Sequence, residues 1–141
     1  MRVLGVDPGT RKVGLALVEA GSVVPRSLAI VPLEALALRF AELAALGPID
    51  VVAIGRGTNA AVASAAAEAA GLRVELVDEH ETTLHARARY FRDHPPRGWR
   101  RLVPRGMLLP DRPIDDYAAL LIAERFLSSL DGGEESRGRP R

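Results

Sequence analysis

The sequence predicts an α/β fold in which helices flank a mixed five-stranded sheet. Two apolar runs, residues 2–7 and 13–20, surround a Pro-Gly-Thr turn and predict an antiparallel hairpin. Further along, an apolar run, an alanine-rich helical segment and a second apolar run predict a strand–helix–strand unit with parallel strands. In a chain of 141 residues, both units are expected to share one sheet and one core.

Turn residues and prolines define the elements of the N-terminal half. A third strand is expected over Val23–Val31, and because Pro25 cannot donate a backbone hydrogen bond, that strand is expected at the sheet edge. Pro32 suits a first helical position, and apolar residues then recur at helical spacing, so a helix is expected up to Gly47-Pro48.

The C-terminal half continues with a strand, a helix, a strand and two further helices. Asn59 is expected to cap the first of these helices, and Gly71 to end it. Prolines and glycines between the last two helices favour a loop. The expected ranges are Asp50–Gly55, Ala60–Ala70, Leu72–Asp78, Thr82 or Thr83 to about Asp93, and Asp115 onward. Residues 1–130 are expected to form one domain, followed by a flexible tail over residues 131–141.

Composition restricts the class of protein. Hydrophobic residues make up 48% of the chain and charged residues 26%, which is typical of a globular domain rather than of a disordered chain. Cysteine is absent, which excludes disulfide frameworks, thiolate metal sites and thiol nucleophiles. No apolar run approaches the roughly 20 residues of a membrane-spanning helix. We therefore expect a cytoplasmic protein with no membrane partner.

Positive charge is concentrated in one stretch. Leu84–Arg112 carries eight Arg against two Asp, a net charge of +6, whereas the rest of the chain is net −5. Guanidinium groups bind phosphate, so this stretch predicts contact with nucleic acid, with Tyr90, Phe91 and Trp99 available to stack on a base. The alternatives are a solvated charged surface for the arginines and core packing for Trp99.

Acidic residues stand at three informative places in the predicted fold. Asp7 ends the first strand, Asp78 and Glu79 end the last strand, and Asp115 and Asp116 begin the last helix. Because the carboxyl ends of neighbouring strands face one crevice, we expect these acids to meet there. Such a set of carboxylates suits Mg²⁺ or Mn²⁺. Taken singly, Asp7 is more often a turn residue, Asp115 and Asp116 are more often helix caps, and Glu79 is open to interpretation as a solvated loop residue.

Three sequence blocks carry a family resemblance. VDPGTRKVGLA at 6–16, VDEHETT at 77–83 and IDDYAALLI at 114–122 resemble, in the same order, the three motifs of the YqgF family of RuvC-related nucleases. The match covers nearly the full chain, to about Leu130. It implies an RNase H-like (ribonuclease H-like) fold. It further implies catalytic and metal-binding roles for Asp7, Glu79 and Asp115, and leaves open whether Asp116 shares them.

The resemblance implies a metal-dependent endonuclease. In such an enzyme two ions, Mg²⁺ or Mn²⁺, hydrolyse a phosphodiester, one activating water and the other stabilising the leaving oxygen. The family is associated with processing the 5′ end of pre-16S rRNA, and therefore with ribosome biogenesis. One alternative is a Holliday junction resolvase acting on four-way DNA in recombination and repair, which would need paired active sites in a homodimer. Another is a non-catalytic module that binds nucleic acid.

Nucleic-acid contacts are expected at three places: the first turn, the loop after the fourth strand and the arginine-rich stretch. At Gly55-Arg56-Gly57 the backbone amides could approach a phosphate, and an ordinary strand-to-helix turn explains the same residues equally well. The expected contact residues are Arg11, Lys12, Arg56, Arg97, Trp99, Arg100, Arg101 and Arg105.

Overall fold

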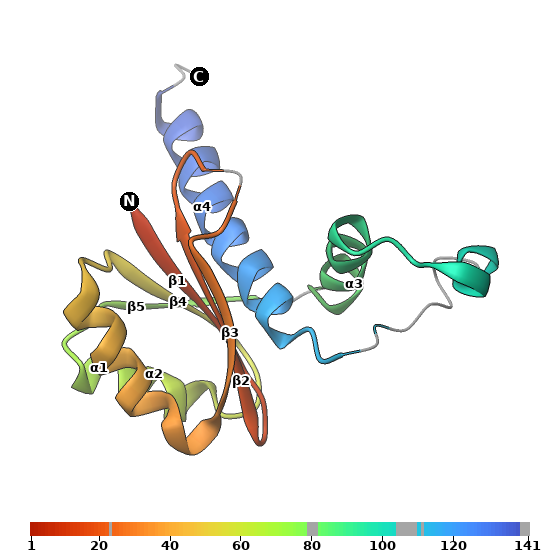
Figure 1. The fold of residues 1–141 in the computed structure, drawn as a ribbon. Coiled ribbons are helices and arrows are strands. Elements are labelled where there is room, and N and C mark those ends of the chain that lie inside the picture. Colours follow the sequence, from red (N-terminus) through yellow and green to blue (C-terminus); the bar gives the residue numbers. More distant parts are fainter. Residues whose placement is uncertain (23, 79–81, 104–109, 111, 139–141) are drawn as a thin grey trace.

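Five strands form one sheet in the order β3-β2-β1-β4-β5 in a computed structural model of the chain (Figure 1). The structure describes residues 1–22, 24–78, 82–103, 110 and 112–138. The strands are β1 (Arg2–Pro8), β2 (Lys12–Glu19), β3 (Ser27–Pro32), β4 (Val51–Gly55) and β5 (Val74–Val77). The helices are η1 (Leu33–Ala35), α1 (Leu36–Leu46), α2 (Ala60–Ala69), α3 (Thr82–Asp93), η2 (Gly98–Leu102) and α4 (Asp115–Gly138), where η denotes a 3₁₀ helix.

Strand pairing confirms both predicted units. β1 pairs antiparallel with β2 along its whole length, and parallel with β4 up to the pair Val6 and Ile54. β4 pairs parallel with β5, and α2 is the crossover between them. Because β1 belongs to both units, the hairpin and the crossover form one mixed sheet.

The edge strand β3 begins later than predicted. It starts at Ser27 rather than at Val23, so Pro25 precedes the strand and is not the reason for its edge position. The chain before β3 is held in a turn: the Ser22 hydroxyl donates to the carbonyl of Val24 at 3.0 Å, and Arg26 pairs with Glu19 at 2.7 Å. The ladder with β2 therefore starts only at Ser27.

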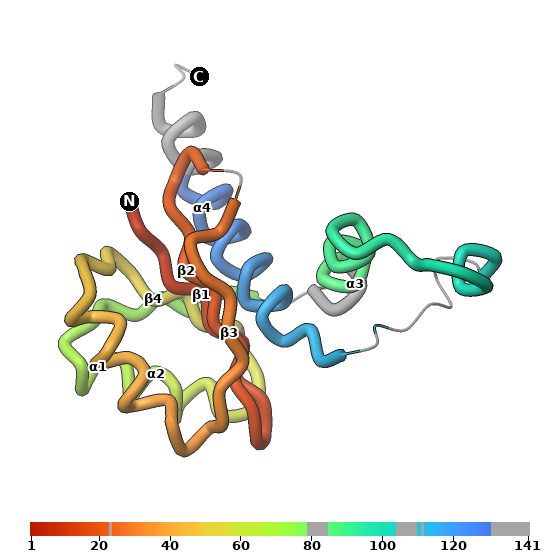
Figure 2. Tube along the Cα trace, viewed as in Figure 1, coloured from red at the N-terminus to blue at the C-terminus, as the bar shows by residue number. Residues whose placement is uncertain are grey.

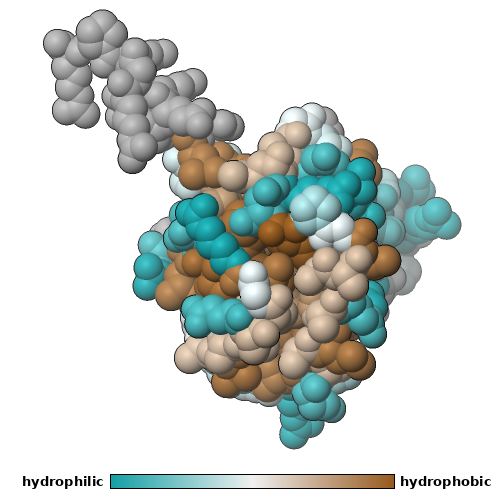
Figure 3. Space-filling model, turned by 90° about the vertical axis from the view of Figure 1, so that its left-hand side faces the viewer, coloured by the Kyte–Doolittle hydropathy of each residue, from teal (hydrophilic) through white to brown (hydrophobic). Residues whose placement is uncertain are grey.

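Helices cover both faces of the sheet, and each face contributes to its own buried cluster. On one face, Leu4, Val6 and Ile54 pack with residues of α1 and α2. On the other, Val3 and Ala53 pack with residues of α3 and α4. Central strands that are buried on both faces explain why β1 and β4 have near-continuous apolar runs. Figure 3 views the molecule from the left-hand side of Figure 1. On this face, apolar side chains are visible between polar ones.

Residues 82–103 form an arm beside the sheet domain. α3 packs along the N-terminal part of α4, and η2 stands farther out (Figures 1 and 2). The loop expected after Asp93 therefore contains a 3₁₀ helix of five residues. α4 continues to Gly138, so a helical backbone runs through most of the segment expected to be a tail, and its mobility stays a prediction. Within the described residues, no helix is long and apolar enough to span a membrane.

Candidate active site

Asp7 lies at the carboxyl edge of the sheet, on the face that α4 covers. Its partner across the β1–β2 hairpin is Gly14. Side chains alternate along a strand, so Asp7 shares a face with Val3, which packs in the cluster on the α4 side. Asp7 is half-buried. A central strand thus presents this carboxylate where the last helix begins.

Asp115 is the first residue of α4 and lies directly over Gly14. A Cβ atom on Gly14 would overlap the backbone carbonyl of Asp115, so only glycine leaves room for this approach. Gly5, two pairs along the same hairpin, makes the same close approach to the carbonyl of Ala119. Because Gly14 is also the cross-strand partner of Asp7, the structure brings the two predicted acids to one place.

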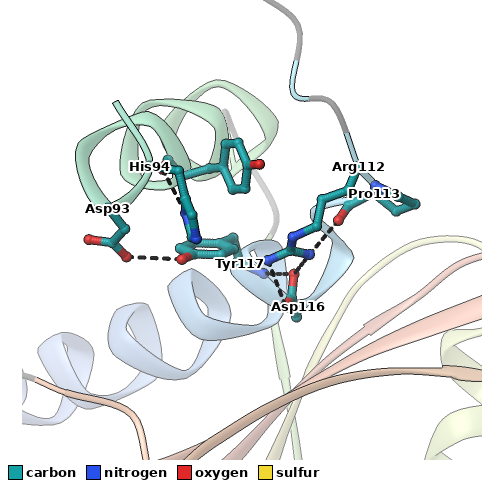
Figure 4. A network of polar contacts seen from close by, with 7 residues as sticks. Asp93, His94, Arg112, Pro113, Asp116 and Tyr117 are labelled. Atoms are coloured by element: carbon teal, nitrogen blue, oxygen red, sulfur yellow. Dashed lines mark hydrogen bonds and ion pairs between the residues drawn. The ribbon is translucent and has the colours of Figure 1, made fainter. Parts of the chain in front are cut away.

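Asp116 has a different role from Asp115. It is buried at 6% exposure and accepts two hydrogen bonds from the Arg112 guanidinium, each at 3.3 Å. It also accepts the backbone N–H of Tyr117 at 2.9 Å (Figure 4). These bonds make Asp116 an anchor for the start of α4. Of the two neighbouring acids, Asp115 is therefore the better candidate for a metal ligand.

Glu79, the third predicted acid, lies outside the described residues. β5 ends at Val77, whose side chain packs into the cluster on the α4 side, and Asp78 is 78% exposed beside Arg56 at 3.4 Å. Among the residues that the structure describes, no three His, Cys, Asp or Glu side chains are grouped as metal ligands. Asp7 and Asp115 supply the oxygen donors that Mg²⁺ and Mn²⁺ prefer. The residues present therefore fit such an ion, and Glu79 remains a sequence prediction.

Contacts between α3 and α4 use several residues that were expected to meet nucleic acid. Tyr90 and Phe91 are only 5% and 3% exposed and belong to the core, so their predicted stacking on bases is wrong. Arg89 pairs with Glu124 of α4 at 2.8 Å. Arg112 lies over the rings of Tyr90 and Tyr117, at 5.3 and 5.6 Å. Part of the basic stretch thus holds the arm on α4.

A buried tyrosine completes this contact. The Tyr117 hydroxyl donates to Oδ2 of Asp93 at 3.0 Å, which links the first turn of α4 to the end of α3 (Figure 4). Burial, and then the hydrogen bond to Asp93, raise the pKa of Tyr117 to about 12. The phenol therefore stays protonated and remains a donor. The hydrogen bond between Asp93 and Tyr117 could not be predicted from their spacing along the chain.

The raised pKa of Tyr117 predicts a loss of stability in strong alkali. The folded pKa of about 12 exceeds the ordinary tyrosine pKa of 10.0, so the protonated phenol stabilises the folded state fully below pH 10. This contribution, at most about 2.7 kcal/mol, is lost as the pH rises from about 10 to about 12. Urea unfolding across this range should show that loss in the wild type and lack it in Tyr117→Phe. A Tyr117 absorbance change centred near pH 10 in the folded protein would contradict the prediction.

The predicted basic contacts fall into two groups. Arg11 and Lys12 are exposed at the β1–β2 turn, and Arg56 is exposed after β4. The amide of Arg56 donates to the carbonyl of Val77 at 2.9 Å, so this N–H serves the sheet rather than a phosphate. The prediction that the Asn59 side chain caps α2 is wrong. This side chain instead donates to the Gly9 carbonyl at 2.8 Å, which joins the two loops near Asp7.

The second group lies on the arm. Trp99 is 74% exposed, so core packing is excluded and its ring is accessible for stacking. Arg97 and Arg101 are exposed beside it, and Arg100 is half-buried with its guanidinium over the Phe91 ring at 6.0 Å. Arg105 lies outside the described residues. η2 therefore presents an aromatic ring among cations at the outer end of the arm.

Comparison with solved structures identifies the class of fold. The Thermus thermophilus RuvC structure aligns with a TM-score of 0.55 and 19% identity, over 87% of this chain and 90% of that one. T. thermophilus RuvC in complex with Holliday junction substrate aligns with a TM-score of 0.59 and 21% identity, over 92% and 96%. The chain therefore has the RuvC-type, RNase H-like fold that the motifs implied.

Sequence comparison then shows the family. No protein-family profile matches the chain. A Pelotomaculum thermopropionicum protein with the name "Putative pre-16S rRNA nuclease" is 34% identical over 157 aligned positions, which cover 100% of this chain and 91% of the relative. The chain belongs to the family of that protein, the YqgF family.

Proposed function

We propose that this protein is a metal-dependent endonuclease that processes the 5′ end of pre-16S rRNA. The observation that carries the proposal is that Gly14, the strand partner of Asp7, lies against the backbone of Asp115 at the carboxyl edge of an RNase H-like sheet. Ligands usually bind at this edge in α/β folds. Membership of the YqgF family, which contains a relative named for pre-16S rRNA, favours RNA as the substrate.

In this proposal Asp7, Glu79 and Asp115 hold the catalytic ions. Bound Mg²⁺ or Mn²⁺ would activate water and stabilise developing charge at the phosphodiester. Asp7 stands on a central strand and Asp115 at a helix start anchored by Asp116, so both positions are rigid before metal binds. Glu79 enters the proposal on its sequence motif.

Cations near the carboxylates would offset their repulsion of the substrate. Arg11 and Arg56 lie on the two loops that the Asn59–Gly9 hydrogen bond joins, and Lys12 begins β2 beside the first of them. The pair between Arg56 and Asp78 is exposed at both ends, and such pairs contribute little stability. Arg56 can therefore exchange Asp78 for a phosphate at small cost.

Cleavage assays on three substrates test the proposed function. Precursor 16S rRNA with its 5′ extension, unstructured single-stranded RNA and four-way DNA are each incubated with Mg²⁺, with Mn²⁺ and with a chelator. We expect metal-dependent cleavage near the mature 5′ end of the rRNA. Symmetric cleavage of the DNA junction alone, by a dimer, would support a resolvase instead. Binding of all three without cleavage would support a non-catalytic module.

The arginines of the arm are expected to bind RNA phosphates, and these contacts should not depend on the base sequence. For single strands, log K falls with log salt by about 0.7 per neutralised phosphate, so changing both Arg100 and Arg101 to Ala should flatten that slope by up to about 1.4. RNA-binding titrations at several salt concentrations measure it. Arg73→Ala removes an exposed cation that lies outside the arm, and it should leave the slope unchanged. An unchanged slope in the double variant would show that these arginines do not contact the backbone.

A further inference from the structure

A pocket of about 470 Å³ lies between the end of α3 and η2, on the arm rather than at the pair Asp7 and Asp115. Its lining includes Asp93, His94, Pro95, Pro96, Arg97 and Arg100, above the buried rings of Tyr90 and Phe91. Pockets of roughly 300–1,000 Å³ hold small molecules in proteins. The volume, and the mixture of rings, one carboxylate and two guanidinium groups, suit a nucleotide.

A stacking platform forms one side of this pocket. The His94 ring stacks on Tyr90, with 4.7 Å between centroids and 19° between planes, and its Nδ1 lies 3.3 Å from the Tyr90 carbonyl. Tyr90 is itself held edge-on by Tyr117 at 5.6 Å. His94 is exposed, so a base can add to this stack. Unpaired RNA bases commonly bind proteins by stacking on aromatic rings.

The carboxylate of Asp93 lines the pocket and offers only hydrogen-bond acceptors to a base. Tyr117 donates to Oδ2 of Asp93, and Figure 4 shows the other oxygen of Asp93 directed away from Tyr117. Each carboxylate oxygen accepts up to two hydrogen bonds, so both oxygens can still accept from a base. A carboxylate only accepts hydrogen bonds. Guanine presents two adjacent donors, N1–H and N2–H₂, on its Watson–Crick edge. The other bases place an acceptor beside each donor, and that acceptor would face the carboxylate. Asp93 therefore fits guanine best.

Two arginines line the pocket and are suited to contact a phosphate. Arg97 is exposed at the rim, and Arg100 lies over the Phe91 ring at 6.0 Å, which restricts its guanidinium. Guanidinium groups bind phosphate oxygens through charge-assisted hydrogen bonds. We propose that this pocket binds one unpaired guanosine nucleotide of the RNA, with Asp93 reading the base and Arg97 and Arg100 holding the phosphate.

The proposal rests on the proposed function for the identity of the bound strand. Tyr117 contacts Asp93 and stands two residues after Asp115, so the pocket joins the start of α4 through one side chain. A guanosine held there would set which phosphodiester reaches the metal site. The arm would thereby select the cleavage position, whereas its other cations bind any sequence.

Binding without metal tests the pocket separately from catalysis. The single tryptophan, Trp99, lies on η2 between Arg97 and Arg100, so its fluorescence reports occupation. An oligouridine with one central guanosine is titrated in chelator, beside matched strands carrying one adenosine, one cytidine or uridine only; anisotropy of labelled strands gives a second readout. We expect the guanosine strand to bind about tenfold tighter, the order that one bidentate base contact supplies.

Variants then assign the preference to the pocket. Asp93→Asn keeps an oxygen acceptor for Tyr117 and should reduce the preference for guanosine to less than about threefold, with thermal unfolding as the folding check. Arg97→Ala should weaken all four strands equally. The control Arg92→Ala removes a neighbouring exposed cation that does not line the pocket, and should keep the guanosine preference.

Two results would overturn the pocket assignment: equal or undetectable binding of all four strands, or a guanosine preference that survives in folded Asp93→Asn. Cleavage of precursor rRNA in the absence of a guanosine preference would leave the proposed function intact and remove the pocket. A guanosine preference in a protein that cleaves none of the substrates would support the pocket and overturn the proposed function.

Discussion

Asp7→Asn is expected to lower metal-dependent cleavage by at least about a hundredfold while the protein stays folded. The substitution removes one anionic ligand and keeps the side-chain volume, so the free energy of unfolding should change by about 1 kcal/mol or less. Single-turnover cleavage at saturating Mn²⁺ and thermal unfolding measure the two effects. Wild-type turnover in the folded variant would remove Asp7 from the proposed site.

The neighbouring acids provide the controls. Glu79→Gln and Asp115→Asn should lose as much activity as Asp7→Asn, and the double variants should lose little more, because groups that act as one unit are non-additive. Asp116→Asn should instead weaken the pair with Arg112, lower the unfolding temperature and leave cleavage within about tenfold of wild type. Inactivation by Asp116→Asn alone, in folded protein, would show that the wrong acid of the pair has been chosen.

Gly14→Ala is expected to reduce both stability and cleavage strongly, although glycine carries no functional group. Its new Cβ would overlap the Asp115 carbonyl, so the start of α4 must move away from β2. Overpacking of this kind costs about 1–3 kcal/mol. Displacement of a catalytic group by about 1 Å can cost a hundredfold in rate. Isothermal titration with Mn²⁺ should also show weaker binding.

Val52→Ala is the matched control for that loss of stability. Val52 is buried on the opposite face of the sheet, among residues of α1 and α2, and its truncation should cost roughly 2 kcal/mol through a cavity. Cleavage per folded molecule should stay at the wild-type level, because α4 does not move. If the two variants lose equal activity per folded molecule, the effect of Gly14→Ala comes from general destabilisation and not from Asp115.

Of the three predicted acids, the structure places Asp7 and Asp115 beside Gly14. The local sequence was enough to predict part of this arrangement. The ends of β1 and α4 could be located from turn and capping residues, so Asp7 and Asp115 could be assigned to element ends. Residue type and position alone did not separate Asp115 from Asp116, because both fit a helix start equally well, and Asp115 was preferred on the motif resemblance. The structure adds a reason for that preference, because the Arg112 guanidinium hydrogen-bonds to both oxygens of Asp116.

The sequence by itself determined the order of the elements, the mixed sheet and the position of Asp7 at the end of β1. These depend on alternation, helical periodicity and turn chemistry, which act over a few residues. Only the tertiary structure decided which arginines face inward and how loops join. The Arg89–Glu124, Tyr117–Asp93 and Asn59–Gly9 contacts link residues 35, 24 and 50 positions apart. No local pattern encodes such pairs, because each forms only after packing has brought two elements together.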